Sequence, residues 1–350
     1  MKVICDREKL REGLALANNV IPAKSTKPVA ENVCLVATDN ALELVGTDME
    51  VSLRYCIDDV KVEDPGTAVI PARVAFDFVR DLSGETITLE IKGSTCTIKS
   101  GADTCELVTV DPDEFPVVAR FDGENAITMQ GGSFAKLVEQ TAFAAAREPG
   151  RYAMHGVLAE LEGDTLRMIA TDGRRLALSE TPVDGSGCEA GTQSIVPTRG
   201  MQMFCRAISD PLDQVQLQFG ETKVGLKTKN AEVFARLIDG EFPRYAAVIP
   251  SETTRHMEAD RVLLAKKLRL VANVTGDEAI FDGHFPGNPL VPGVLLTESL
   301  AQLSGMVAFS KSQSSGPTPA HLAQADMKFR NAICPPAAIT LHSQLTRRMG

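Results

Sequence analysis

The feature that most constrains this chain is an internal repeat, in which short motifs occur twice in the same order. Thr47-Asp48 is repeated as Thr171-Asp172, and each pair directly follows two short apolar segments joined by a turn. Three further pairs keep the order: Val69-Ile70-Pro71 with Ile195-Val196-Pro197, Gly93 with Gly220, and Glu114-Phe115-Pro116 with Glu241-Phe242-Pro243. The members of each pair lie 124 to 127 residues apart. We interpret the repeat as one domain duplicated in tandem.

Each copy combines helical and strand periodicity. Residues 7–20 place Leu10, Leu14 and Ala17 on one helix face, and Val74, Phe78 and Leu82 do the same in a second segment. The second copy has matching segments, with Phe134, Leu137, Val138 and Ala142, and then Met201, Phe204, Cys205 and Ile208. Short alternating segments separated by turn residues lie between them. The pattern predicts an α+β fold, with antiparallel sheets and helices on one side.

The length and composition of the chain limit the classes of protein to which it can belong. A chain of 350 residues with 44% hydrophobic content is long enough for two or three domains, and it has no apolar run of the length that spans a membrane. The first residues lack the apolar stretch of a secretory signal. Eight cysteines are scattered without a Cys-x-x-Cys pair. We therefore expect a cytoplasmic protein with no membrane segment, no metal and no cofactor.

The net charge of −10 is unevenly distributed. The helical segments and their adjoining loops, at 7–27, 72–81, 132–151 and 198–208, hold twice as many Lys and Arg as Asp and Glu. If these helices share a face, that face is positive on an acidic body and suits a surface that passes along a polyanion. The alternative is that helices simply carry more Lys and Arg, with no bearing on function.

The first 250 residues contain no recognisable catalytic constellation. His155 is the only histidine there, and no Ser, Cys or carboxylate partner is apparent. Asp48 and Asp172 could act as catalytic acids, since each copy has one. We instead interpret both Thr-Asp pairs as turns in which the carboxylate accepts backbone hydrogen bonds.

Residues 1 to about 258 resemble the bacterial sliding clamp, the β subunit of the replicative DNA polymerase. The resemblance rests on landmarks in sequence order: Met1-Lys2-Val3, Gly46-Thr47-Asp48, Pro71-Ala72-Arg73, the run from Ala170 to Ala177, Val196-Pro197, and the run from Asp239 to Tyr245. In that family two subunits of three similar domains close head to tail around duplex DNA. The resemblance implies a homo-oligomer that cuts no bond.

The same resemblance implies two sets of functional residues. The DNA-facing set is Lys24, Lys27, Arg73, Arg151, Tyr152 and Arg199. The second set lines a groove for short apolar peptides of the replicative polymerase and the clamp loader, and comprises Met154, Thr171, Gly173, Arg174, Arg175, Leu176, Pro243 and Val248. Small and apolar walls with arginine at the rim suit such a peptide.

A third copy of the clamp unit is absent after Asp260, and a different signature begins. It comprises Gly283-His284-Phe285-Pro286-Gly287-Asn288-Pro289, Val291-Pro292-Gly293-Val294 and Glu298-Ser299-Leu300-Ala301-Gln302, followed by an apolar helical pattern. Residues 262–350 resemble a hot-dog-fold 3-hydroxyacyl-acyl-carrier-protein dehydratase. The leader and the last two strands of that family are missing, which predicts an incomplete hot-dog fold with a central apolar helix against a partial antiparallel sheet.

The chemistry of a dehydratase fits three residues of this signature. His284, in an exposed loop, suits the base that removes the C2 proton. Glu298, on an apolar helix, would be desolvated and held protonated as the acid for the leaving hydroxyl. The amide of Gly293 can donate to the thioester oxygen from a helix N-terminus. The resemblance implies that His284 and Glu298 come from opposite subunits and that the partner is acyl-carrier protein.

We therefore predict clamp domain I at residues 1–122, clamp domain II at 123–255 and a partial dehydratase-like domain at 262–350. The predicted function is that of a DNA polymerase processivity factor, which encircles DNA and tethers the polymerase through the peptide groove. Two alternatives stay open. The chain could work as a dehydratase, with the clamp half taking no part in the activity. It could also be a chimera with neither activity intact.

Overall fold

The computed structural model describes residues 1–249, apart from 149–152, 185–186 and 189–190. The chain divides into two units, Met1–Val248 and Ile249–Gly350. The predicted hot-dog domain, with His284, Gly293 and Glu298, lies outside the described residues. Within the described residues, no helix is long and apolar enough to cross a membrane.

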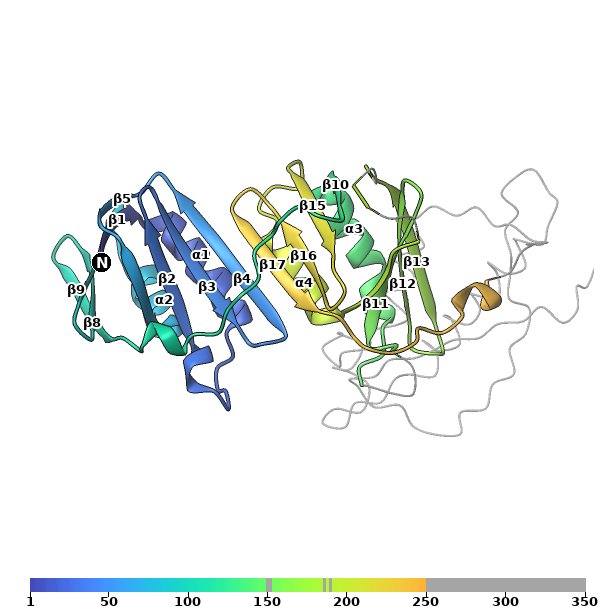
Figure 1. The fold of residues 1–350 in the computed structure, drawn as a ribbon, viewed down its shortest axis with the longest axis horizontal. Coiled ribbons are helices and arrows are strands. Elements are labelled where there is room, and N and C mark those ends of the chain that lie inside the picture. The colour runs from blue at the N-terminus through green and yellow to red at the C-terminus, as the bar shows by residue number, and fades with distance from the viewer. Residues whose placement is uncertain (149–152, 185–186, 189–190, 250–350) are drawn as a thin grey trace, which may run out of the picture. The chain divides into compact units, whose positions relative to one another are not determined.

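The first repeat alternates two helices with two groups of strands (Figure 1). Its elements are β1 (Lys2–Asp6), α1 (Arg7–Val20), β2 (Asn32–Thr38), β3 (Ala41–Thr47), β4 (Val51–Asp58), β5 (Lys61–Asp64), β6 (Gly66–Pro71), α2 (Ala72–Asp81), β7 (Thr86–Lys92), β8 (Thr95–Ser100) and β9 (Asp103–Val108). Short 3-10 turns, η1 (Pro28–Glu31) and η2 (Pro112–Glu114), lie in its connections.

The second repeat has the same element order, except that the described residues between β13 and β14 form an isolated bridge, Asp184 with Thr128, in the place of β5. Its elements are β10 (Ala126–Gln130), α3 (Gly131–Thr141), η3 (Ala142–Ala144), β11 (Gly156–Glu162), β12 (Thr165–Thr171), β13 (Leu176–Pro182), β14 (Gln193–Pro197), α4 (Thr198–Ala207), β15 (Gln214–Phe219), β16 (Lys223–Lys227), β17 (Ala231–Arg236) and η4 (Tyr245–Val248). The antiparallel strands and few helices confirm the predicted clamp-like α+β class.

The strands of residues 1–249 form three antiparallel sheets. Their orders are β5-β1-β7-β8-β9, then the eight-stranded β10-β15-β16-β17-β4-β3-β2-β6, and β13-β12-β11-β14. The eight-stranded sheet crosses from one repeat to the other where β17 pairs with β4, with Val233 opposite Leu53. Flanking backbone bonds join Arg236 N to Glu50 O and Cys56 N to Asn230 O, both at 2.8 Å. Sequence reading missed β17 and this joint.

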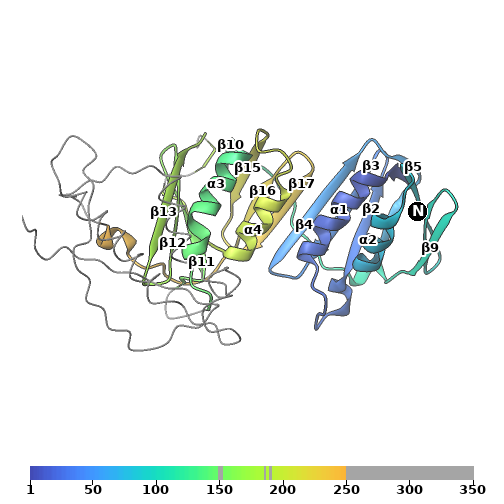
Figure 2. The ribbon, with the colours of Figure 1, turned by 180° about the vertical axis from the view of Figure 1, so that it is seen from behind.

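The four α-helices of the described residues cover one side of the sheets (Figure 2). Neighbouring helices contact one another in the order α2, α1, α4, α3. Their apolar residues pack on the sheets, with Leu10, Leu14 and Phe134 among the fully buried side chains. Gly13 allows α1 to lie close to β4, because a Cβ there would come within 2.6 Å of the Tyr55 ring. The predicted helix at 7–20 is confirmed.

The joint between repeats also involves helix α4. Arg199 forms an ion pair with Asp48 at 2.6 Å, and the Asp48 side chain is only 7% exposed. The Arg199 guanidinium also donates to the carbonyl of Val20, at the end of α1, and Arg206 donates to Asn19 Oδ1. The helix side of the joint is therefore fixed by arginines of the second repeat.

On the opposite face, the connection between repeats is held by Arg54 of β4. Its guanidinium donates to the carbonyls of Val118 and Ala119 at 2.9 and 3.1 Å, and pairs with Glu43 at 3.2 Å. Arg120 also pairs with Glu43. The connection runs over the sheet in front of β4 and β17 in Figure 1, so both faces of the joint carry polar anchors.

We predict that Asp48→Ala lowers the free energy of unfolding by about 2 kcal/mol, because the turn and Arg199 both lose a buried partner. The matched control is Asp172→Ala, which removes the same turn bonds but only an exposed ion pair with Arg175. Urea unfolding of both variants measures the difference. Equal losses would mean that the bond between Arg199 and Asp48 contributes nothing to the joint.

Candidate functional site

The turn between β12 and β13 carries most of the residues predicted to line the peptide groove. The Thr171 hydroxyl donates to the carbonyl of Arg175 at 2.7 Å and accepts from the amide of Gly173 at 3.1 Å. Gly173 has a φ of 83°, a left-handed conformation that glycine adopts without strain. The turn is thus set by its own side chains, and it leaves Gly173, Arg174 and Arg175 exposed.

Asp172 completes this turn. Its carboxylate accepts from the amides of Arg174 and Arg175 at 3.0 and 3.1 Å, and these bonds lower the pKa of Asp172. In the first repeat, Asp48 accepts in the same way from the amides of Glu50 and Val51. The interpretation of both aspartates as turn residues is therefore confirmed.

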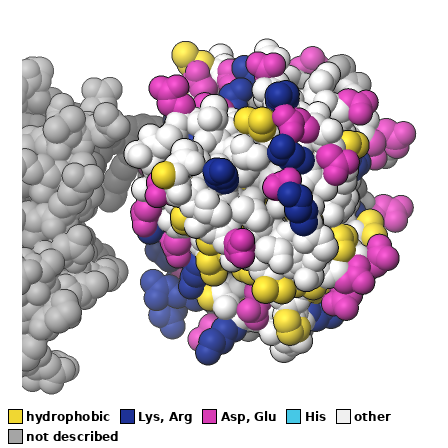
Figure 3. Space-filling model, turned by 90° about the vertical axis from the view of Figure 1, so that its left-hand side faces the viewer, with side chains coloured by type: hydrophobic (Ala, Val, Ile, Leu, Met, Phe, Trp, Pro, Cys, Tyr) yellow, Lys and Arg dark blue, Asp and Glu magenta, His cyan; other side chains and the backbone are white. Residues whose placement is uncertain are grey.

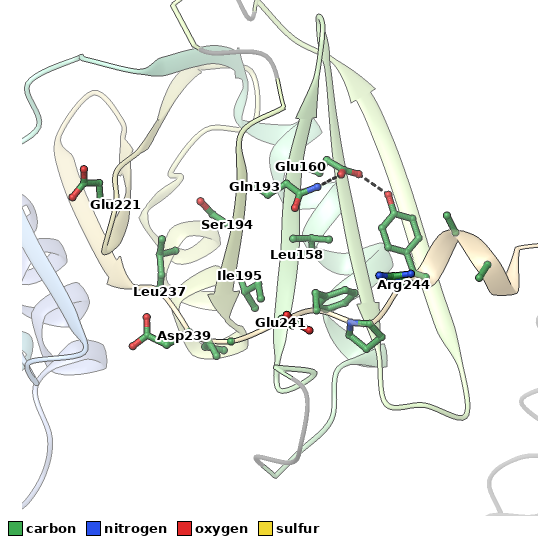
Figure 4. A pocket seen from close by; sticks show the side chains of 17 residues that line it. Leu158, Glu160, Gln193, Ser194, Ile195, Glu221, Leu237, Asp239, Glu241 and Arg244 are labelled. Atoms are coloured by element: carbon green, nitrogen blue, oxygen red, sulfur yellow. Dashed lines mark hydrogen bonds between the residues drawn. The ribbon is translucent and has the colours of Figure 1, made fainter.

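An apolar cluster lies on the sheet of β11 to β14, away from the helices. Its buried members are Ala153, Leu158, Ile169 and Ile195, and Leu176, Ile238, Phe242 and Tyr245 pack against them. Residues 237–247 run along this surface and enclose an open pocket of about 970 Å³, shown in Figure 4. Among the predicted groove residues, Pro243 lines the pocket and Leu176 belongs to the cluster.

Glu160 anchors the segment that borders the pocket. Its carboxylate accepts from the Tyr245 hydroxyl at 2.5 Å and from the side-chain amide of Gln193 (Figure 4). Burial raises the pKa of Tyr245, and the bond to Glu160 raises it further. Arg167 lies 3.7 Å from Glu160, and hydrogen bonding to Tyr245 is the main cause that raises the arginine's pKa. Sequence reading assigned no role to these residues.

The remaining predicted groove residues lie around this surface. The Arg175 guanidinium stacks over the Phe143 ring, with 5.6 Å to the ring centroid, and Phe143 is 60% exposed. Val248 is also exposed. Met154 is half-buried, and its carbonyl accepts from the amide of Ala146 at 2.8 Å. An apolar surface with exposed arginines at one end suits an extended peptide with apolar anchors and acidic flanks.

Two of the residues predicted to face DNA, Arg73 and Arg199, lie on the helices. The four helices hold eight Lys or Arg and five Asp or Glu, so this side is weakly positive on an acidic chain. Lys24 and Lys27 are exposed in the segment after α1, and Arg73 is exposed on α2. Arg199 is held by Asp48 at the joint. The predicted residues Arg151 and Tyr152 lie outside the described residues.

The repeated α+β unit, joined edge to edge with all helices on one side, is the architecture of DNA-clamp proteins. A crystal structure of the DNA polymerase III β subunit from Pseudomonas aeruginosa matches with a TM-score of 0.72 and 28% identity, covering 79% of this chain and 76% of that one. A sliding clamp from Bacillus subtilis has a TM-score of 0.73 at 23% identity, which supports the fold alone.

Sequence comparison gives the family. The beta sliding clamp of Pseudomonas putida KT2440 is 30% identical over 281 residues, and that of Escherichia coli K12 is 29% identical over 279 residues. In both cases the match covers 79% of this chain and 76% of the relative. Models of the N-terminal and central domains of the DNA polymerase III beta subunit match residues 1–119 and 128–244. The chain belongs to the beta sliding clamp family.

A different family matches the C-terminal residues. A FabA-like domain model covers residues 262–349, which supports the resemblance to a dehydratase that the sequence motifs indicated. The family models therefore support both resemblances, to the sliding clamp before residue 250 and to the dehydratase after it.

We predict that Tyr245→Phe loosens the segment at 238–248 and leaves the sheet beneath it intact. Loss of one hydrogen bond to a carboxylate costs about 1.5 kcal/mol. Amide exchange in this segment should therefore accelerate about tenfold. Tyr55→Phe is the control, since that hydroxyl also bonds a carboxylate, Glu12, but on the helix side. Unchanged exchange in Tyr245→Phe would contradict the anchoring role of Glu160.

Proposed function

We propose that residues 1–248 act as a DNA polymerase processivity factor, a clamp that encircles duplex DNA and tethers the polymerase. The observation that carries this proposal is membership of the beta sliding clamp family through 76% of the relatives' length. We assign residues 1–122 and 123–255 to clamp domains I and II, and we place the protein in the cytoplasm as a homo-oligomer.

The helix side is the proposed DNA surface. A sliding surface needs weak, sequence-independent attraction to phosphates, and a modest excess of basic side chains supplies it. Lys24, Lys27 and Arg73 are exposed and form no ion pair among the described residues, which leaves them free to reach phosphates. We include Arg151, Tyr152 and Arg199 in this surface. Arg199 also forms the ion pair with Asp48 at the joint.

The outer groove is the proposed site for the replicative polymerase and the clamp loader. An apolar anchor of a partner peptide would pack on Leu176 and Pro243, next to the cluster around Leu158. Thr171 and Gly173 would form the small-residue wall. Arg174 and Arg175 would meet acidic flanks, while Met154 and Val248 extend the apolar surface.

We predict that Leu176→Ala weakens binding of the purified replicative polymerase about tenfold, because an apolar anchor loses part of its buried contact. Surface plasmon resonance with the full chain immobilised gives the affinity. Leu212→Ala is the matched control, since Leu212 is 77% exposed and lies outside the groove. Equal affinities for both variants would argue against the groove.

We predict salt-resistant retention of the chain on circular DNA, loaded by a clamp loader, and release when the circle is linearised. Topological linkage does not depend on ion pairs, whereas ordinary phosphate binding weakens steeply as salt rises. Gel filtration of loaded circles in high salt measures retention. Loss of the chain from circles and linear DNA alike would contradict encirclement.

A second candidate function rests on the FabA-like match at residues 262–349. In this proposal the partial dehydratase-like domain at 262–350 takes an acyl-carrier-protein substrate, with His284 as base, Glu298 as acid and the Gly293 amide as donor to the thioester. Hydration of an enoyl thioester by the full chain, abolished in His284→Ala, would support it. Absence of the activity in the parent chain removes it.

A further inference from the structure

A second pocket lies at the joint between the repeats. Its volume is about 360 Å³, and its lining comes from the turn between β3 and β4, the connection at 116–119, the start of β16 and the end of β17. Phe234 of β17 is buried in this lining, on the side of the sheet opposite to its neighbours Val233 and Ala235, which belong to the main core. Both repeats contribute walls, so the pocket is complete only when the joint has formed.

The turn that borders this pocket is the counterpart of the turn that borders the proposed peptide groove. The Thr47 hydroxyl donates to the carbonyl of Val51 at 2.9 Å and accepts from the amide of Met49 at 3.0 Å. Thr171 makes the same two bonds in the second repeat. Met49 has a φ of 77°, close to the 83° of its counterpart Gly173. The first repeat therefore has its own version of the groove turn, with an exposed apolar side chain added.

The apolar surface beside the pocket is also repeated. Three buried members of each cluster correspond at the spacing of the repeat: Cys34, Val45 and Val69 in the first, and Leu158, Ile169 and Ile195 in the second. Val118 belongs to the first cluster and also lines the pocket, so the two are continuous. Pro116 lines this pocket, as Pro243 lines the pocket of the second repeat. Most of the features of the groove are thus present a second time at the joint.

Two basic side chains of the second repeat lie on the opposite wall. The Lys223 ammonium is 5.9 Å from the centroid of the Phe234 ring. Arg236 lies 3.8 Å from Glu50, and both side chains are 62% exposed. Such an exposed ion pair contributes little, so the carboxylate of a ligand can compete with Glu50. The charged residues of the lining are these two cations and one carboxylate, on a chain with a net charge of −10. At the end of the unit that carries β8 and β9, by contrast, acidic and basic side chains are interspersed (Figure 3).

We propose that this pocket binds a short extended peptide of another protein, with one apolar side chain on Phe234 and Val118 and an acidic side chain between Lys223 and Arg236. The volume is at the lower end of the range for small-ligand pockets, so it suits one or two anchoring side chains. An apolar anchor beside a carboxylate matches both the apolar and the positive part of the lining. The chain would then have a second docking site at the joint, separate from the groove of the second repeat.

Photo-cross-linking of a synthetic peptide to the full chain tests this site without DNA or polymerase, so the outcome is independent of the proposed function. The probe carries benzoylphenylalanine next to a leucine, with aspartates on both sides. We expect cross-links to Met49 and Val117, the exposed apolar residues of the lining, identified by mass spectrometry. Arg174→Glu with Arg175→Glu, which changes the groove of the second repeat, should leave these cross-links intact.

Charge reversal tests the basic wall. Lys223→Glu with Arg236→Glu should lower the yield of cross-links at the joint about tenfold. A probe with lysines in place of the aspartates should restore the yield, which a misfolded chain could not do. The matched control is Lys99→Glu with Lys229→Glu, the same change of charge at exposed residues outside the pocket, and it should leave the yield unchanged.

Two results would overturn the proposal. The first is the absence of cross-links to Met49 and Val117, with the probe attached only near Leu176 or not at all. Occupation of the pocket by residues 249–350 of the same chain, or by a second copy, would give this result. The second is an equal loss of yield in the charge-reversed chain and in its control, because attraction would then depend on net charge alone.

Discussion

The structure of residues 1–248 depends on the pairing of β17 with β4. A strand edge with free backbone groups is costly to bury and prone to misassociation, so each repeat needs a partner for the edge that it exposes. At this joint Val233 and Leu53 are fully buried, and backbone bonds continue the ladder at both ends. Two half-sheets thereby become one eight-stranded sheet, and the helices of both repeats come to lie in one row. A side covered by helices and an opposite sheet face follow from that single pairing, and the helix side is the one that we propose to face DNA.

The Thr-Asp turn occurs in both repeats with the same hydrogen bonds, but its aspartate has a different arginine partner in each. In both copies the carboxylate accepts two backbone amides, and the threonine hydroxyl closes the turn. In the first repeat the second carboxylate oxygen of Asp48, Oδ2, forms the ion pair with Arg199 across the joint. In the second repeat Asp172 orients Arg175 at the end of the apolar groove. The hydrogen bonds of the turn are the same in both copies, and its neighbours decide whether the carboxylate pairs across the joint or with an exposed arginine of its own turn.

The sequence predicted the features that depend on local periodicity and turn chemistry, namely the buried helix face and the turns. Leu10, Leu14 and Ala17 lie on the buried face of α1, and the turns at Asp48 and Asp172 formed as expected. The pairing of β17 with β4 could not be read from it, because strand order depends on contacts between residues far apart in the chain. The hydrogen bond between Tyr245 and Glu160 could not be predicted for the same reason, since 85 residues separate the partners. The sequence motifs shared with sliding clamps identify the family, but they do not predict these contacts.

Hydrogen exchange of the full chain tests most directly whether the two repeats share one sheet. Amides of Val51–Tyr55 and Ala231–Ala235 that bond across the joint should be among the slowest to exchange and should become exposed together, because they belong to one cooperative ladder. Amides on the outer side of β9, which have no partner strand among residues 1–249, should exchange much faster. Fast exchange of β4 and β17, at rates like those of the outer β9 amides, would show that the two repeats do not share one sheet.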